Sequence, residues 1–583
     1  MVRKILLLLI VCATLFIGCK KDAGSGPSDK KGNEAFTAYE EHFLDALWKL
    51  NPDWATGEGY HKYDSLLVIP NEKSRDAMLN FIKLQNDSLS RFEVNDLSEL
   101  NKIDYRLMQN HLDYTNWQIM ILKAYEWNPT HYNVVGTFAQ ILNKPYAPLA
   151  KRLRNFYEKM ADLPAYYKEA EKQIKNPVPE LTDQAIEQQT GGINVMEKDF
   201  LDSLKKTNIP KDEQKKMTER AKISAESIRA YIAWLKNIKN DHARSFRLGK
   251  EFYDDKFKYE TQSAYSAQQL FNMAGERKKQ VHREMTKLSR QLWPKYFGKK
   301  TMPADSLEMI SRVLDTLSGK HTTPGAFQSA IENQFPKLTA FLKARDLVTV
   351  DLTKPLLVRK LPAYFANAAF ASMSLPGAYD KGGNSYFYIS NLSALPPDKA
   401  ESYLREYNQY ILQILCIHEA IPGHYVQQVY ANKAQSKIKA IFGNTAMIEG
   451  WAVYSEQMML ENGYDDSPEM KLMWYKWHLR SVCNSILDYA VHCLSMTKEQ
   501  AMTFLTKEAF QQQAEAEGKW KRVSVTSVQL DSYYDGYKEI IDLREAYKTK
   551  MGDKYKLKDF NEKFLSYGSV PVKFIRTAML GNK

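Results

Sequence analysis

Cysteine is scarce in this sequence, with five residues among 583. Cys12 and Cys19 lie near the start of the chain, and only Cys416, Cys483 and Cys493 follow. The later three include no Cys-x-x-Cys pair, which excludes a zinc ribbon, and they are too few and too scattered for a disulfide framework. We therefore expect the body of the protein to contain free, buried thiols.

Long apolar runs and dense basic runs are also missing. Beyond the start of the chain, no apolar run approaches the roughly 18 residues that a membrane-spanning helix needs. Lys and Arg outnumber Asp and Glu by 81 to 69, but no basic stretch lies beside aromatic residues as in nucleic-acid-binding modules. We therefore expect no nucleic-acid partner. A hydrophobic content of 44% excludes a disordered chain.

The start of the chain has the pattern of a lipoprotein signal peptide. Arg3 and Lys4 precede the apolar stretch 5–17, which is too short to span a bilayer as a helix. The next residues complete a lipobox-like sequence, LFIGC, in which cleavage precedes a cysteine that carries diacylglycerol. We expect residues 1–18 to be removed and Cys19 to anchor the protein in a bacterial envelope membrane through acyl chains. The alternative is an ordinary cleaved signal peptide.

The rest of the chain has the periodicity of a helical protein. We expect a flexible tether at 19–33, rich in Gly, Ser, Lys and Asp. An N-terminal helical region at 34–250 and a C-terminal region at 251–583 follow, unless the two form one continuous domain. Strand patterns are found at 347–350, 356–361 and 385–389. Apolar residues recurring at intervals of three and four predict helices over 36–50, 75–93, 97–125, 149–175, 211–240, 266–291, 305–317, 324–343, 397–420, 444–462, 469–494 and 527–550.

The most informative segment is His418-Glu419-Ala-Ile-Pro422-Gly423-His424. Two neutral imidazoles can ligate zinc, and a carboxylate between them can accept a proton from metal-bound water. The histidines are six residues apart, so a straight helix would separate them by about 120° and about 9 Å. Pro422 cannot donate a hydrogen bond to the carbonyl of His418, and Gly423 tolerates unusual backbone angles. A local break is therefore predicted to bring His424 back toward His418.

A third ligand is expected from the acidic helix at 444–462. Glu449 and Glu456 share one face of this helix but are about 10.5 Å apart by helical rise, so a single ion can take only one of them. We take Glu449 as the ligand. Glu456 could orient a histidine from behind or lie in solvent.

The predicted helix 469–494 carries Arg480, Asn484, Asp488 and His492 at intervals of four residues. This polar stripe is either the solvent-facing edge of a mostly buried helix or the lining of a wet cleft. In the second case Arg480 or His492 could stabilise an oxyanion. Asp488 and His492 could also form an orienting pair.

These motifs make the chain similar to the bacterial family called domain of unknown function 885 (DUF885). Its members are often lipoproteins and look like gluzincin-type zinc metallopeptidases. The most specific shared blocks are H-E-A-x-P-G-H at 418–424 and E-G-W-A at 449–452. Supporting matches cover most of the chain and comprise Trp48, Asn51, Pro52, Ala55, Thr56, Gly59, His61, Tyr63, Asp64, Arg480, Asp488, His492, Tyr533, Gly536, Ile540, Leu543, Arg544 and residues 568–571.

The resemblance implies a mainly α, metallopeptidase-like fold with a small β-sheet beside the zinc helices. In such folds an edge strand before the first zinc helix aligns an extended peptide by backbone pairing. In this chain that strand would be formed by Tyr386, Phe387 and Tyr388. Tyr533 matches a tyrosine of the family pattern and becomes the candidate oxyanion donor, ahead of His492.

Together these features predict a lipid-anchored zinc peptidase that acts on peptides outside the cytoplasm. His418, His424 and Glu449 would bind one Zn²⁺, and Glu419 would take a proton from water and pass one to the leaving amine. One alternative is a non-catalytic peptide-binding lipoprotein on the same scaffold, although such a protein would not need Glu419. Another is a zinc hydrolase of non-peptide amides or cell-wall fragments.

Overall fold

The computed structural model describes residues 27–351, 353–354, 356–361, 371–380, 384–434 and 436–581. The predicted signal peptide, Cys19 and the first half of the predicted tether lie outside the described residues. The described chain is mainly helical with one small sheet, which confirms the predicted fold class. Cys416 and Cys483 are free, buried thiols, as predicted, whereas Cys493 is free but only partly buried.

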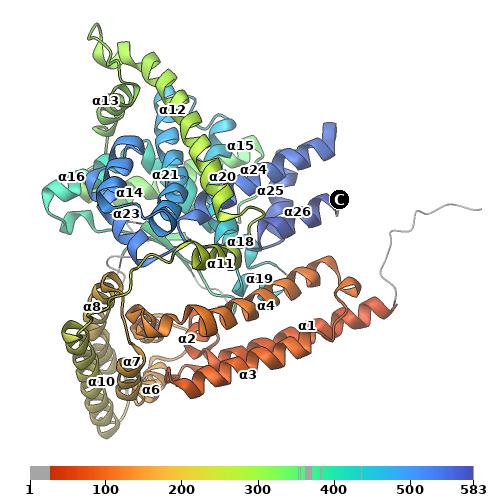
Figure 1. Cartoon of the computed structure of the whole chain (residues 1–583), viewed down its shortest axis with the longest axis vertical. Helices are drawn as coiled ribbons and strands as arrows, with labels where there is room; N and C mark the ends of the chain where they lie inside the picture. The colour runs from red at the N-terminus through yellow and green to blue at the C-terminus, as the bar shows by residue number, and fades with distance from the viewer. Residues whose placement is uncertain are drawn as a thin grey trace, which may run out of the picture.

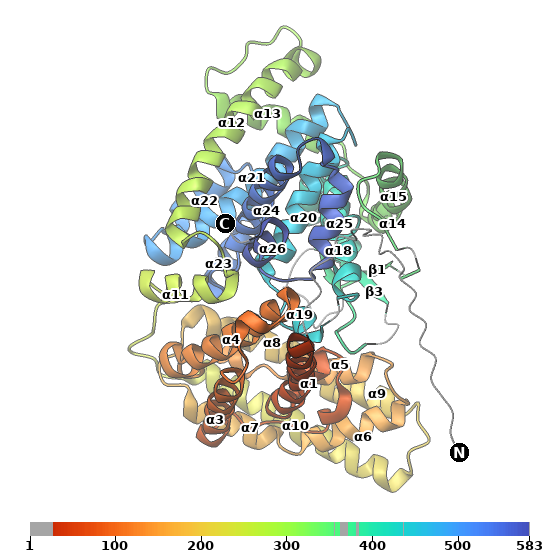
Figure 2. The same cartoon turned by 90° about the vertical axis from the view of Figure 1, so that its right-hand side faces the viewer.

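Figures 1 and 2 show two layers of helices, with the N-terminal part of the chain below and the C-terminal part above. The lower layer contains α1 (Pro27–Leu50), α2 (Pro52–Gly57), α3 (Glu72–Leu89), α4 (Glu99–Trp117), α5 (Val135–Asn143), α6 (Leu149–Met160), α7 (Leu163–Gln173), α8 (Pro179–Asn194), α9 (Phe200–Leu204) and α10 (Lys211–Asn237). The upper layer begins with α11 (Lys250–Thr261), α12 (Ala267–Phe297), α13 (Ser306–Ser318), α14 (Phe327–Glu332), α15 (Gln334–Arg345) and α16 (Pro397–Glu406). It continues with α17 (Ile411–Glu419), α18 (His424–Ala431), α19 (Lys437–Ile441), α20 (Thr445–Glu461), α21 (Pro468–Cys493), α22 (Lys498–Thr503), α23 (Gln513–Val525), α24 (Asp531–Met551), α25 (Leu557–Ser566) and α26 (Val572–Leu580).

The apolar core crosses between these layers. The larger cluster of buried side chains contains Trp48 and Met108 from the lower layer together with Trp451 and Leu543 from the upper one. A second cluster lies almost entirely within residues 132–235. The predicted boundary near residue 250 falls at the connection between α10 and α11, but α1 to α4 share the core of the C-terminal half. The two halves are therefore joined by apolar packing as well as by the chain.

Several predicted helix signals are present in the structure. The side chain of Ser467 accepts a hydrogen bond from the backbone of Met470 and Pro468 is the first residue of α21, which is a typical N-terminal arrangement. The predicted helix 397–420 is divided into α16 and α17, because the Asn408 side chain caps the start of the second segment by accepting from the backbone N–H of Tyr410 and Ile411.

The sheet has the strand order β1-β3-β2, formed by β1 (Leu356–Lys360), β2 (Ala371–Ser374) and β3 (Ser385–Ile389). β3 pairs in parallel with β1 and antiparallel with β2. The expectation that Tyr386, Phe387 and Tyr388 belong to an edge strand is therefore wrong, since β3 is the central strand and its backbone pairs on both sides. The edge strand beside the helices that carry His418 and His424 is β2, whose Ala-Ser-Met-Ser sequence lacks the β-branched and aromatic residues that signal a strand.

A buried ion pair fastens α19 of the upper layer to α4 of the lower one. The Lys439 ammonium lies 2.6 Å from a carboxylate oxygen of Asp104, and the two side chains are 3% and 1% exposed. Lys439 also donates to the carbonyl of Leu100 at 3.1 Å. Burial, and then Asp104, raise the pKa of neighbouring Glu40 to about 8. Lys439 is therefore the cation that offsets a buried acidic site.

Lys439→Met is expected to lower the free energy of unfolding by about 3–5 kcal/mol, because the substitution leaves Asp104 buried without its partner. Urea unfolding followed by circular dichroism measures this change. Combining Lys439→Met with Asp104→Leu removes both charges and should restore most of the loss. A single variant that costs less than about 1 kcal/mol would contradict the assignment, as would a double variant less stable than the single one.

Candidate metal centre

The two histidines of the motif lie on either side of a helix break. His418 is the penultimate residue of α17, and His424 is the first residue of α18. Between them the chain makes a tight turn in which the backbone of Gly423 donates to the carbonyl of Ile417 at 2.9 Å. A Cβ atom on Gly423 would lie 1.7 Å from the carbonyl oxygen of His418, so only glycine fits there. The imidazole centroids are 4.9 Å apart, which confirms the predicted convergence.

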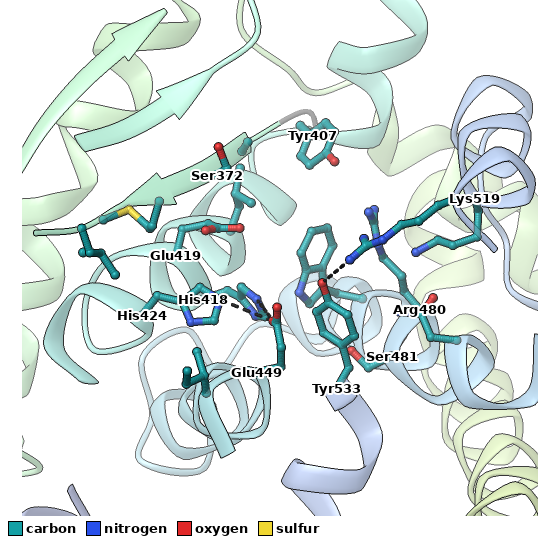
Figure 3. Close-up of a pocket in the computed structure, with 18 residues that line it drawn as sticks. Ser372, Tyr407, His418, Glu419, His424, Glu449, Arg480, Ser481, Lys519 and Tyr533 are labelled. Carbon is teal, nitrogen blue, oxygen red and sulfur yellow. Dashed lines mark hydrogen bonds and ion pairs between the residues drawn. The ribbon is translucent and has the colours of Figure 1, made fainter. Parts of the chain in front are cut away.

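Glu449 of α20 lies beside the two histidines. Its Oε2 atom lies 3.5 Å from Nε2 of His418 and 3.4 Å from Nε2 of His424. The residue after it, Gly450, packs directly on Gly536 of α24, where a Cβ atom would lie 2.3 Å from the Gly536 backbone. This close helix contact positions Glu449. Three donor atoms from His418, His424 and Glu449 lie within 4.8 Å of one another, so the three residues form a group that could hold a metal ion (Figure 3).

The spacing of these atoms fits a tetrahedral ion. Metal–ligand bonds of about 2.0–2.1 Å in tetrahedral geometry place neighbouring ligand atoms about 3.3–3.4 Å apart. The two nitrogen–oxygen distances are 3.5 and 3.4 Å. Oε2 of Glu449 is buried and has no hydrogen-bond partner. Burial alone would raise the pKa of Glu449, but the facing imidazoles hold it well below its usual value, so the carboxylate is ionised. These residues therefore suit a bound cation.

Glu456 lies behind His418 rather than in solvent. Nδ1 of His418 is 2.7 Å from Oε1 of Glu456, and the indole of Trp477 donates to the same oxygen at 3.0 Å. The Glu456 side chain is fully buried. A carboxylate at Nδ1 fixes the ring so that Nε2 faces Glu449, which is the orienting role considered for Glu456.

Glu456→Gln is expected to weaken metal binding by about 10- to 100-fold, because an amide carbonyl is a poorer acceptor for His418 than a carboxylate. Competition with a chromogenic chelator measures the affinity. Glu461→Gln, on the exposed end of the same helix, is the matched control and should leave the affinity unchanged. Equal affinities for Glu456→Gln and the unmodified protein would show that Glu456 does not support the metal.

The metal group opens into a cavity of about 400 Å³. Glu419 lines it beside the histidines, and Figure 3 shows its side chain close to Ser372 of β2. Burial raises the pKa of Glu419, while His424 and His418 oppose that rise. A carboxylate held next to His418 and His424 and open to the cavity is placed to exchange protons with a bound molecule.

Tyr533, on the first turn of α24, also lines the cavity. Its ring stacks on that of His418 with centroids 6.3 Å apart. Arg522 donates to the Tyr533 hydroxyl oxygen at 3.1 Å. Because that oxygen acts as the acceptor in this bond, its own proton is available for a ligand in the cavity.

The polar stripe of α21 divides into two parts. Arg480 and Asn484 line the cavity, and Arg480 pairs with Glu515 at 2.6 Å. His492 does not reach the cavity, so the idea that it stabilises an oxyanion is not supported by its position. It lies about 18 Å along the helix from Arg480 by rise. Its Nε2 atom instead bonds the carbonyls of Val523 and Thr526 at 3.0 and 2.9 Å.

Asp488 holds the same connection between α23 and α24. Its carboxylate oxygens accept from the backbone of Val528 and Leu530, each at 3.0 Å. Asp488 and His492 are 3.9 Å apart, and both contact the segment that joins Arg522 to Tyr533. They therefore position cavity residues from a distance rather than forming a pair at the metal group.

Two cations of the cavity, Lys519 and Arg522 of α23, were not found by sequence reasoning. They lie three residues apart and so share a helix face. That spacing is their only signal in the sequence, and it equally fits a solvated surface helix. β2, which contributes Ala371, Ser372 and Met373 to the lining, was also missed.

With this geometry in view, the chain can be compared with known proteins. A family model described as "Bacterial protein of unknown function (DUF885)" matches residues 52–579. The chain belongs to this family. A solved structure of a "putative lipoprotein of unknown function" from Shewanella oneidensis is 46% identical, with a TM-score of 0.85 over 94% of this chain and 99% of the other.

A second solved structure, described as "the putative lipoprotein", comes from Colwellia psychrerythraea. It is 16% identical and has a TM-score of 0.76 over 94% of this chain and 99% of the other, so it shows that the fold is shared. No curated protein matches the chain. Within the described ranges, none of the helices has the length and apolar character to cross a bilayer.

Proposed function

We propose that the protein is a zinc-dependent peptidase of the bacterial envelope, anchored through Cys19. The observation that carries the proposal is the convergence of His418, His424 and Glu449 beside Glu419 at the wall of one cavity. Two imidazoles and one carboxylate are a common ligand set for catalytic zinc, in which the fourth position stays open. The Shewanella oneidensis and Colwellia psychrerythraea descriptions and the LFIGC sequence support the anchor.

Zinc in this group would polarise a substrate carbonyl and lower the pKa of a coordinated water. The residues of the chain supply the remaining chemistry. Glu419 accepts a proton from the attacking water and then delivers it to the leaving amine, which needs a carboxylate that alternates between two protonation states. Tyr533 donates a hydrogen bond from its hydroxyl group to the developing oxyanion. The cationic side chain of Arg522, which donates to the same hydroxyl oxygen, makes Tyr533 a stronger hydrogen-bond donor.

The edge strand β2 is positioned to hold a peptide. Its residues Ala371, Ser372 and Met373 line the cavity, and within the described sheet β2 pairs with β3 on one side only. An extended substrate can add to the other side through backbone hydrogen bonds. This assigns to β2 the aligning role expected of β3 from the sequence.

Metal removal tests the proposal. The purified protein is expected to contain one zinc per chain by elemental analysis and to cleave members of a mixed peptide library, detected by mass spectrometry. Dialysis against a chelator should abolish cleavage, and stoichiometric zinc should restore it. The reason is that the metal would supply the main electrostatic stabilisation of the transition state.

His424→Ala is the matched variant for this experiment and should retain neither zinc nor cleavage. Non-peptide amides and cell-wall fragments are tested in parallel, and cleavage of these alone would indicate a different hydrolase. Absence of zinc, or cleavage that survives its removal, would overturn the proposed function. Peptide binding without turnover would indicate the non-catalytic scaffold.

A further inference from the structure

Three cationic side chains line the same cavity as the metal group. They are Arg480 of α21 and Lys519 and Arg522 of α23. Figure 3 shows Arg480 and Lys519 together on one side of Tyr533, with His418, His424 and Glu449 on the other. The proposed mechanism uses Arg522 only as a partner of Tyr533 and gives no role to the other two.

The carboxylates nearest these cations already have partners. Glu515 pairs with Arg480 at 2.6 Å. Nearby Glu406 is held by Lys476 at 2.8 Å, and both of those side chains are 4% exposed. Arg480 and Lys476 thus pair with these two carboxylates, and the other carboxylates of the cavity, Glu419 and Glu449, lie with the metal group.

Lys519 is the cation of this group that most clearly lacks a partner among the described residues. It is 4% exposed, and it forms no hydrogen bond or ion pair with any residue in the described parts of the chain. Burial, and then Arg480, lower its pKa well below the usual value. A buried ammonium without a partner is costly, so a bound anion would stabilise the charged form.

Arg480 and Arg522 also retain donor capacity. Nη1 of Arg480 is buried and has no hydrogen-bond partner. Arg522 donates to two neutral oxygens, those of Gln529 at 2.6 Å and Tyr533 at 3.1 Å. The three cations therefore offer several N–H groups to one cavity, which is a typical environment for an anion.

We infer that Arg480, Lys519 and Arg522 form a subsite for a carboxylate of the substrate. The inference rests on the proposed function, because a peptide is the ligand that brings a carboxylate into this cavity. Two groups of a peptide could supply it, the C-terminal α-carboxylate or an acidic side chain. With the α-carboxylate in the subsite, cleavage would fall near the C-terminal end of the substrate, because both sites share one cavity of about 400 Å³.

Selective capture tests the subsite without requiring turnover. The zinc-loaded Glu419→Gln protein is immobilised and incubated with random N-acetylated hexapeptides, present in equal amounts as free acids and C-terminal amides. Mass spectrometry measures which are retained. If the subsite binds the α-carboxylate, free acids are expected to be enriched about tenfold or more over amides. If it binds an acidic side chain, amides that contain Asp or Glu should be enriched to the same extent over amides that contain Asn or Gln. A charge-assisted hydrogen bond supports a preference of that size.

Lys519→Met, made in the same protein, should abolish the enrichment, and Lys519→Arg should restore it. Loss of an unpartnered buried charge is not expected to lower the melting temperature, which separates a binding effect from misfolding. Lys521→Met is the control, because Lys521 lies on the same helix but is half exposed and pairs with Glu187 on the surface. It should behave as the unmodified protein.

Three results would overturn the inference. They are enrichment below twofold in both comparisons, enrichment by Lys519→Met equal to that by the protein with Lys519, and retention of no peptide. The same two mixtures are also given to the zinc-loaded protein with Glu419 intact. Cleavage of acids and amides at equal rates would leave the proposed function standing while the subsite fails. Lys519-dependent enrichment without cleavage of either mixture would support the subsite and reject the peptidase.

Discussion

Glu419→Gln is expected to lower kcat for peptide hydrolysis by about three orders of magnitude while leaving one zinc bound per chain. The substitution keeps the size of the side chain and removes its ability to accept and return a proton. Glu419 is not one of the three residues whose donor atoms converge, so the metal group should remain intact. Steady-state kinetics on a peptide cleaved by the unmodified protein, together with elemental analysis, measure both quantities.

Glu401→Gln is a suitable control for this experiment. Glu401 lies on α16, is half exposed and contacts His321, away from the residues that line the cavity. The control should keep full activity. If Glu419→Gln retained more than about a tenth of kcat, another group would have to be the base. If it lost zinc, its lower activity would say nothing about proton transfer.

The position of the metal group could be predicted because its determinants are local. The six-residue spacing of His418 and His424 conflicts with a straight helix, and Pro422 and Gly423 are the residues that relieve that conflict. The structure has the break at this point, with α17 ending at Glu419 and α18 starting at His424. Helical rise limited the third ligand to either Glu449 or Glu456, and the structure brings Glu449, the predicted ligand, to the two histidines.

The remainder of the site depends on tertiary packing, which no local pattern encodes. Arg480 and His492 belong to one series with four-residue spacing, but over twelve residues that series turns by about 120° around the helix. One therefore reaches the cavity, and the other bonds the end of α23. Lys519 and Arg522 belong to a short, charged helix whose sequence is typical of a solvated surface, yet Lys519 is buried in the folded protein. The order of strands in the sheet likewise cannot be read from strand sequences, so β3 was placed at an edge.

Gly423→Ala is expected to remove zinc binding and to lower peptide hydrolysis at least 100-fold, although Gly423 is not itself a ligand. The added Cβ atom would lie 1.7 Å from the His418 carbonyl oxygen and 2.4 Å from that of Ile417, far inside van der Waals contact. The backbone between the histidines must therefore move. A shift of about 1 Å is enough to spoil metal-ligand geometry that tolerates about 0.2 Å.

The same overlap should cost at least about 2 kcal/mol of unfolding free energy, measured by urea denaturation of the metal-free protein. Gly275→Ala provides the matched control. Gly275 lies within α12, where an added Cβ atom meets nothing within 4 Å. In a helix interior that change should stabilise the protein by about 0.5–1 kcal/mol and leave zinc in place. A Gly423→Ala protein that bound zinc with unchanged affinity would show that the turn at Pro422 and Gly423 can deform without separating the two imidazoles, and the steric explanation of this motif would then be wrong.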